Sequence, residues 1–125
     1  MQLAKSAIRS GIAILLEYAG LAESDLEQVI IAGAFGNYLR VSSAIAIGLL
    51  PPLTADRFAQ IGNAALIGAK LALVSCPHRA EAQAIAERSR YVELAGSARF
   101  SREFMARLTF PARDSVREAV LDADP

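Results

Sequence analysis

Residues 28–37 read QVIIAGAFGN, and this stretch decides the fold of the chain. Its apolar run, Val29–Ala32, is short and rich in β-branched residues, with a polar, acidic stretch before it and glycines after it. Such a run is typical of a buried strand. The strand is expected to end in a turn at Gly33 and Gly36, where the missing Cβ lets the backbone bend sharply and lets another group approach closely.

A helical segment is expected to begin near Val41, so the stretch predicts a strand, a turn of small residues and a helix. This arrangement can present backbone N–H groups and an open face to a phosphate or a nucleotide. A tight connection that binds no ligand has the same local sequence. These ten residues alone favour neither interpretation.

The composition indicates one domain and excludes several kinds of partner. The chain has 125 residues with 13 basic and 13 acidic side chains, so its net charge is zero. The basic residues are scattered and are not interleaved with aromatic ones, as a nucleic-acid surface or a polybasic membrane patch requires. No apolar run approaches the roughly 20 residues of a membrane span. We therefore expect neither nucleic acid nor membrane as a partner.

Cysteine and histidine are too scarce for a metal site. Cys76 is the only cysteine and His78 the only histidine. A disulfide within the chain is impossible, and this usage predicts a reducing, cytoplasmic setting. The two residues flank Pro77, a pattern typical of a turn at a helix end. We predict no metal ligands, and we expect Pro77 to end a helix.

Hydrophobic periodicity predicts an alternation of helices and strands along the chain. Helices are expected at residues 1–19, 41–48, 64–75, 79–90 and 101–108, and strands at residues 29–32, 57–61 and 91–94. This order indicates an α/β layer structure with a small mixed sheet and packed helices. Residues 1–111 are expected to form one lobe, and residues 112–125 a flexible polar tail.

A second glycine turn, Gly62 and Asn63, follows the second predicted strand. The helix after it is dense in small residues, and its interior Gly68 costs about 1 kcal/mol relative to alanine. That cost predicts close packing of this helix against the strand at residues 29–32, with the two glycine turns side by side. On the first helix, Lys5 and Arg9 lie one turn apart. A solvated face is the expected interpretation, and a face that borders a ligand is the alternative.

The motifs resemble those of a known superfamily. Residues 29–36 and 62–69 resemble the adenosine motif and the second connecting motif of the actin, sugar-kinase and heat-shock chaperone superfamily, with Ala34 where many relatives have a second glycine. The stretches AGAFGNYL (32–39), IGLLP (47–51) and IGNAA (61–65), followed by Glu93, Leu94 and residues 100–104, look more closely like the end of the reductive activators of corrinoid proteins. The resemblance covers roughly residues 3–111.

The resemblance implies both a fold and a function. The fold would be the C-terminal lobe of an actin-like, sugar-kinase-like ATPase domain. The function would be that of the C-terminal ATP-binding segment of an ATP-dependent reductive activator, which transfers electrons to inactive cobalt(II) corrinoid proteins. The partner would be a corrinoid protein or a corrinoid-dependent methyltransferase.

In that family the complete protein binds ATP with Mg²⁺ and carries an iron–sulfur cluster in an N-terminal domain. The present sequence shows no Asp-x-Gly phosphate loop and only one cysteine. We therefore assign it no catalytic residue, and we expect these 125 residues alone to be inactive as an ATPase.

The resemblance also assigns nucleotide contacts, namely Gly33, Ala34, Phe35, Gly36, Asn37, Gly62 and Asn63. The glycines of the first turn would form the floor under the nucleotide. Phe35 can instead belong to the core, and Asn37 can simply hold the turn. The contrasting hypothesis is a non-enzymatic interaction or dimerisation module that keeps the fold without a nucleotide. The apolar composition further predicts self-association, most simply as a symmetric dimer.

Overall fold

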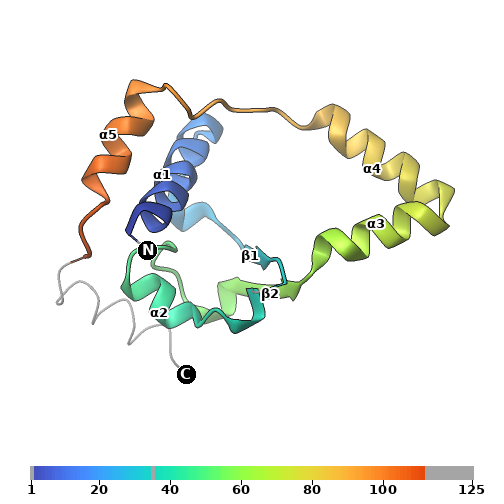
Figure 1. Ribbon diagram of the computed structural model, residues 1–125, viewed down its shortest axis with the longest axis horizontal. Coiled ribbons are helices and arrows are strands. Elements are labelled where there is room, and N and C mark those ends of the chain that lie inside the picture. The colour runs from blue at the N-terminus through green and yellow to red at the C-terminus, as the bar shows by residue number, and fades with distance from the viewer. Residues whose placement is uncertain (1, 35, 112–125) are drawn as a thin grey trace. The chain divides into compact units, whose positions relative to one another are not determined.

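The computed structural model describes residues 2–34 and 36–111 (Figure 1). The described residues fall into two compact units. The first unit contains residues 2–29, 39–59 and 93–111, and the second contains residues 30–34, 36–38 and 60–92. The tail predicted at residues 112–125 and the contact predicted for Phe35 lie outside the described residues.

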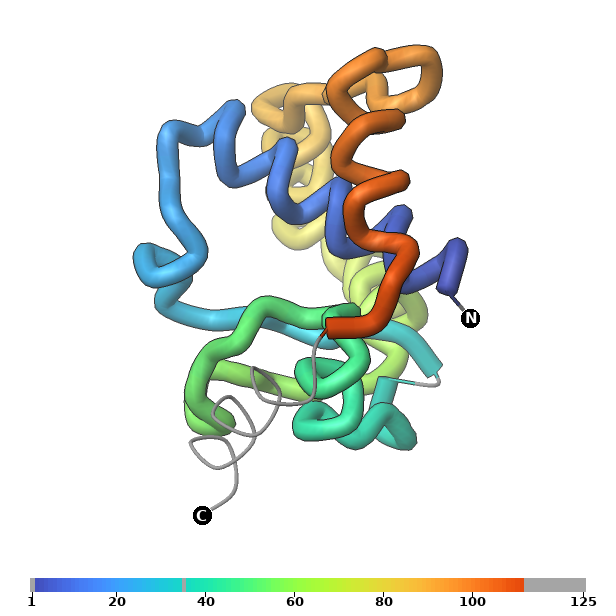
Figure 2. The backbone as a smooth tube through the Cα atoms, turned by 90° about the vertical axis from the view of Figure 1, so that its left-hand side faces the viewer, coloured from blue at the N-terminus to red at the C-terminus, as the bar shows by residue number. Residues whose placement is uncertain are grey.

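The first unit is built on two helices that lie side by side. Helix α1 (Gln2–Ala19) packs against α5 (Ala98–Ala106), as Figures 1 and 2 both show. Gly20, with a φ of 69°, ends α1 in the left-handed region that favours glycine. A short helix, α2 (Val41–Ala46), and the 3-10 turns η1 (Glu23–Asp25) and η3 (Ala55–Arg57) complete the unit. Its apolar core is small and consists of Ile14, Ala44, Ile45 and Leu50.

The chain has one sheet in the described residues, in which strands β1 (Val29–Ala32) and β2 (Phe58–Gly62) run parallel. A 3-10 turn, η2 (Gly36–Tyr38), follows the first strand. In the second unit, β2 leads into α3 (Ala64–Val74), which packs against α4 (Cys76–Arg88). Each of these helices is capped at its start, α3 by the side chain of Asn63 and α4 by that of Ser75.

Most predicted elements are confirmed, including both strands that precede the glycine turns and the α/β class. Pro77, however, lies in the first turn of α4 instead of ending a helix. The first turn tolerates proline, because its N–H would have no partner within the helix. Helix α5 is capped by Ser97 and begins at Ala98, three residues before the predicted start at residue 101. The strand predicted at residues 91–94 is wrong, since these residues have no regular structure and the described sheet has two strands.

The close packing predicted at Gly68 is also wrong. A Cβ built on this glycine meets no other heavy atom of the described residues within 4 Å. The helix packs against α4, and Gly68 is exposed. Gly68 therefore lies on an open part of the α3 surface in place of a tight contact with β1.

Candidate functional site

The two glycine turns meet at the ends of the paired strands. The backbone N–H of Gly33 donates to the carbonyl of Gly62 at 2.7 Å. The φ angles are 125° at Gly33 and 60° at Gly62, in the region that favours glycine over residues with a side chain. Parallel pairing places the carboxyl ends of both strands at one edge of the sheet. The two turns thus lie side by side in the second unit.

Gly33 and Gly36 have different surroundings. A Cβ on Gly33 would meet no heavy atom of the described residues within 4 Å, so these residues leave the space beside Gly33 open. A Cβ on Gly36 would lie 3.3 Å from Cγ2 of Ile31 and 3.5 Å from its carbonyl oxygen. Gly36 is therefore needed for packing of the turn on its own strand. Gly33 is the glycine at which an external group can approach the backbone, and Ala34 beside it is exposed.

Side-chain amides connect the two turns. Gln60 Nε2 donates to the carbonyl of Gly36 at 2.8 Å. The Nδ2 atom of Asn37 lies 3.3 Å from the position that a Cβ of Gly62 would occupy, so the amide of Asn37 lies close against this glycine. Sequence reasoning missed Gln60. Its one signal is a polar residue, flanked by Ala59 and Ile61, two positions before the second glycine turn.

The side chain of Asn63 caps helix α3. Its Oδ1 accepts a hydrogen bond from the N–H of Leu66 at 3.1 Å and so caps the start of α3. The helix consequently begins at Ala64, directly after its cap. Six predicted contacts, Gly33, Ala34, Gly36, Asn37, Gly62 and Asn63, belong to the two adjoining turns.

Lys5 and Arg9 do not form a solvated face. Their exposed fractions are 3% and 8%, and Ser6 and Ser10 between and beside them are fully buried. These four residues repeat at helical spacing and turn one side of α1 inward. The interpretation of a charged outer face is wrong because α5 and the segment after it cover this side of the helix.

Residues 2–34 and 36–111 contain no group of three potential metal-ligating side chains. Cys76 is a free, exposed thiol. Among the same residues, no helix combines the length and the apolar character needed to cross a membrane.

Comparison with known proteins finds similarity to a family model, to a curated relative and to a solved structure. A family model described as the C-terminal domain of RACo, the ASKHA domain, matches residues 1–120. The corrinoid activation enzyme RamQ of Eubacterium limosum is 42% identical over 110 residues, covering 88% of this chain and 18% of the relative. A solved structure of a reductive activator for a corrinoid, iron–sulfur protein is 39% identical, with a TM-score of 0.81 and the same coverages of 88% and 18%. The chain thus spans about a fifth of the length of these relatives, and it belongs to the family of RACo C-terminal ASKHA domains.

Proposed function

We propose that this chain is the C-terminal ATP-binding segment of an ATP-dependent reductive activator, a protein that transfers electrons to inactive cobalt(II) corrinoid proteins. Family membership and the names of the two relatives support this function. The observation that carries the nucleotide-binding part is the open space at Gly33, beside its 2.7 Å bond to Gly62. The same observations favour this function over an interaction module without a nucleotide.

In this proposal the two glycine turns hold one side of the nucleotide. Gly33 provides the close approach, and the exposed amide of Asn37 offers both a donor and an acceptor to a ribose or a phosphate. Ala34, Gly62 and Asn63 border the same space. Mg²⁺ would accompany ATP in the complete protein, where it neutralises phosphate charge. The present residues show no phosphate loop to organise it.

The iron–sulfur cluster of the complete activator would require other residues. Such clusters are held by about four cysteine thiolates, and this sequence has Cys76 alone. We propose that the partner is a corrinoid protein or a corrinoid-dependent methyltransferase, on the strength of the relatives' names. A cytoplasmic setting agrees with the single unpaired cysteine.

Calorimetric titration with ATP and ADP tests the nucleotide site. Gly33→Val fills the open space, and ATP binding should weaken at least about tenfold. Gly96→Val is a matched control, because Gly96 also has a positive φ, of 77°, and no heavy atom within 4 Å of its added Cβ. Both variants place a valine at a positive φ, but only the first should lose the nucleotide. Equal ATP affinity in the two variants, or no binding by the unaltered chain, would overturn the proposed site.

A further inference from the structure

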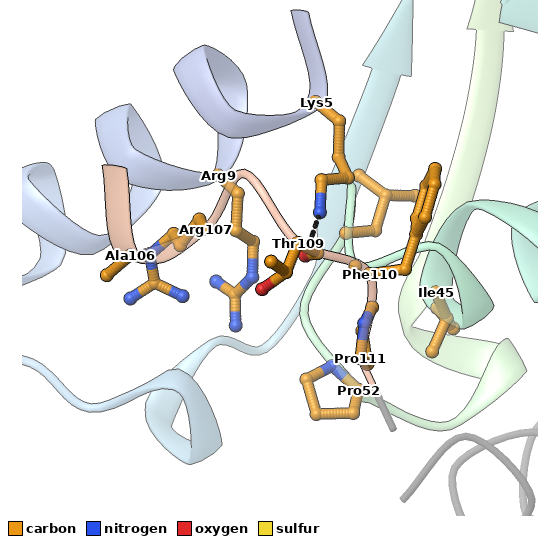
Figure 3. Close-up of a pocket in the computed structure, with 11 residues that line it drawn as sticks. Lys5, Arg9, Ile45, Pro52, Ala106, Arg107, Thr109, Phe110 and Pro111 are labelled. Carbon is orange, nitrogen blue, oxygen red and sulfur yellow. Dashed lines mark hydrogen bonds between the residues drawn. The ribbon is translucent and has the colours of Figure 1, made fainter. Parts of the chain in front are cut away.

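A cavity in the first unit is lined by three cationic side chains. Lys5 and Arg9 extend into it from α1, and so does Arg107, the residue directly after α5 (Figure 3). The cavity has a volume of about 340 Å³. Its remaining walls are largely apolar and include Ile45 and Phe110. No carboxylate lines it among the described residues.

Lys5 is a buried cation with no acidic partner among the residues that the structure describes. Its Nζ donates to the carbonyl oxygen of Thr109 at 2.7 Å and lies 5.0 Å from the centroid of the Phe110 ring. Within residues 2–34 and 36–111, no carboxylate forms an ion pair with it. An ammonium group can donate three hydrogen bonds, and a buried charge is normally paired. Lys5 is 3% exposed, so its charge lies in a largely water-shielded site where no described carboxylate pairs with it.

Arg9 is likewise incompletely satisfied. Its Nη2 donates to both carboxylate oxygens of Glu23, at 2.6 and 2.7 Å. Its Nη1 is buried and has no hydrogen-bond partner in the part of the chain that the structure describes. Arg107 differs, because Glu103 pairs with its Nε and Nη2 atoms at the end of α5. Two of the three cations thus have a carboxylate partner, and Lys5 has none among the described residues.

We propose that this cavity binds a small organic oxyanion, a carboxylate or a phosphate ester on an apolar body, whose charged group lies at Lys5 and Arg9. An oxyanion supplies the missing countercharge of Lys5 and acceptors for the unused guanidinium edge of Arg9. The apolar walls contact the rest of the ligand, and the volume lies within the range of small-molecule sites. The site is formed by the first unit alone and does not depend on the proposed nucleotide contacts.

Titration of the chain with benzoate, phenyl phosphate and inorganic phosphate, followed by NMR, tests the proposal. Benzyl alcohol serves as the uncharged control. Benzoate or phenyl phosphate should bind with a Kd at or below about 1 mM and shift the signals of Ile45 and Phe110. Signals of Ile67 and Leu73, which belong to the second unit, should stay in place. The relative affinities of the three anions distinguish a carboxylate from a phosphate ligand.

Two pairs of variants separate the site from nonspecific charge. Lys5→Met keeps the length of the side chain and should weaken anion binding at least about tenfold, whereas Lys70→Met on the exposed face of α3 should not. Arg107→Gln should weaken anion binding less than Lys5→Met does. Arg102→Gln, at an exposed residue of α5, should have no effect on anion binding. If Lys5→Met does not fold, the NMR shifts of Ile45 and Phe110 in the unaltered chain, with the anions against benzyl alcohol, test the proposal instead. No binding, equal shifts with benzyl alcohol, or equal affinity within each pair would overturn the proposal.

Discussion

Arg57 reaches back across 31 residues and donates from Nη1 to the carbonyl of Leu26 at 2.7 Å, and to that of Ser24 at 3.0 Å. The 3-10 turn before β2 is thereby tied to the chain that leads into β1. These two bonds help to set which residues of the two strands face each other, and so they support the alignment of Gly33 with Gly62.

The first prediction is that Arg57→Met destabilises the fold. The substitution removes two charge-assisted hydrogen bonds and leaves two carbonyl groups without these donors. A loss of about 1.5–3 kcal/mol in the free energy of unfolding is expected. Urea denaturation measures it, and Arg90→Met serves as a control on an exposed cation. Equal midpoints for the two variants would show that the Arg57 bonds contribute nothing to stability.

The second prediction concerns pH. Burial lowers the pKa of the Lys5 ammonium from its ordinary value of 10.5. Between the lowered pKa and 10.5, the unfolded chain binds more protons than the folded one, so stability rises with pH in this window. The unaltered chain should gain stability relative to Lys5→Met as the pH increases toward 10.5. Denaturation midpoints of both proteins across alkaline pH test this, and parallel curves would contradict it.

The third prediction contrasts two glycines. Gly68→Ala should stabilise the chain by up to about 1 kcal/mol, because alanine favours the helix and its methyl group meets open space. Gly36→Ala should destabilise it, since the new Cβ would lie 3.3 Å from Ile31. Thermal melts of both variants give the comparison. A melting temperature for Gly68→Ala below that of the unaltered chain would contradict this and would indicate that Gly68 is closely packed.

The fourth prediction is that the 125-residue chain self-associates. Leu66, Ile67, Leu73 and Val74 of α3 are between 50% and 80% exposed, which leaves an apolar surface on the second unit. We expect a dimer in sedimentation experiments, with Leu73→Asp shifting it toward the monomer. Leu3→Asp, at an exposed leucine of α1, is the control. A monomer at all concentrations, or equal dissociation by both variants, would contradict association through α3.

Local sequence predicted the elements around the glycine turns well. Three features set the backbone conformation of only a few neighbouring residues: the β-branched run at Val29–Ala32, the glycines after both strands and the small residues of α3. Their effect therefore does not depend on distant parts of the chain. The resemblance of the motifs also predicted the protein family, and the comparisons confirm that prediction. The nucleotide contacts at Gly33, Asn37 and Asn63 stay a prediction.

The sequence by itself determined the strands before the two glycine turns, the helices and the positions of the turns, because backbone propensity is a local property. Only the tertiary structure decided that Lys5 and Arg9 are buried, that residues 91–94 form no strand and that Gly68 is open. Each of these outcomes depends on which segment covers a given face. A lysine at helical spacing looks the same in the sequence whether water or Thr109 and Phe110 lie next to it, and long-range packing alone makes that choice.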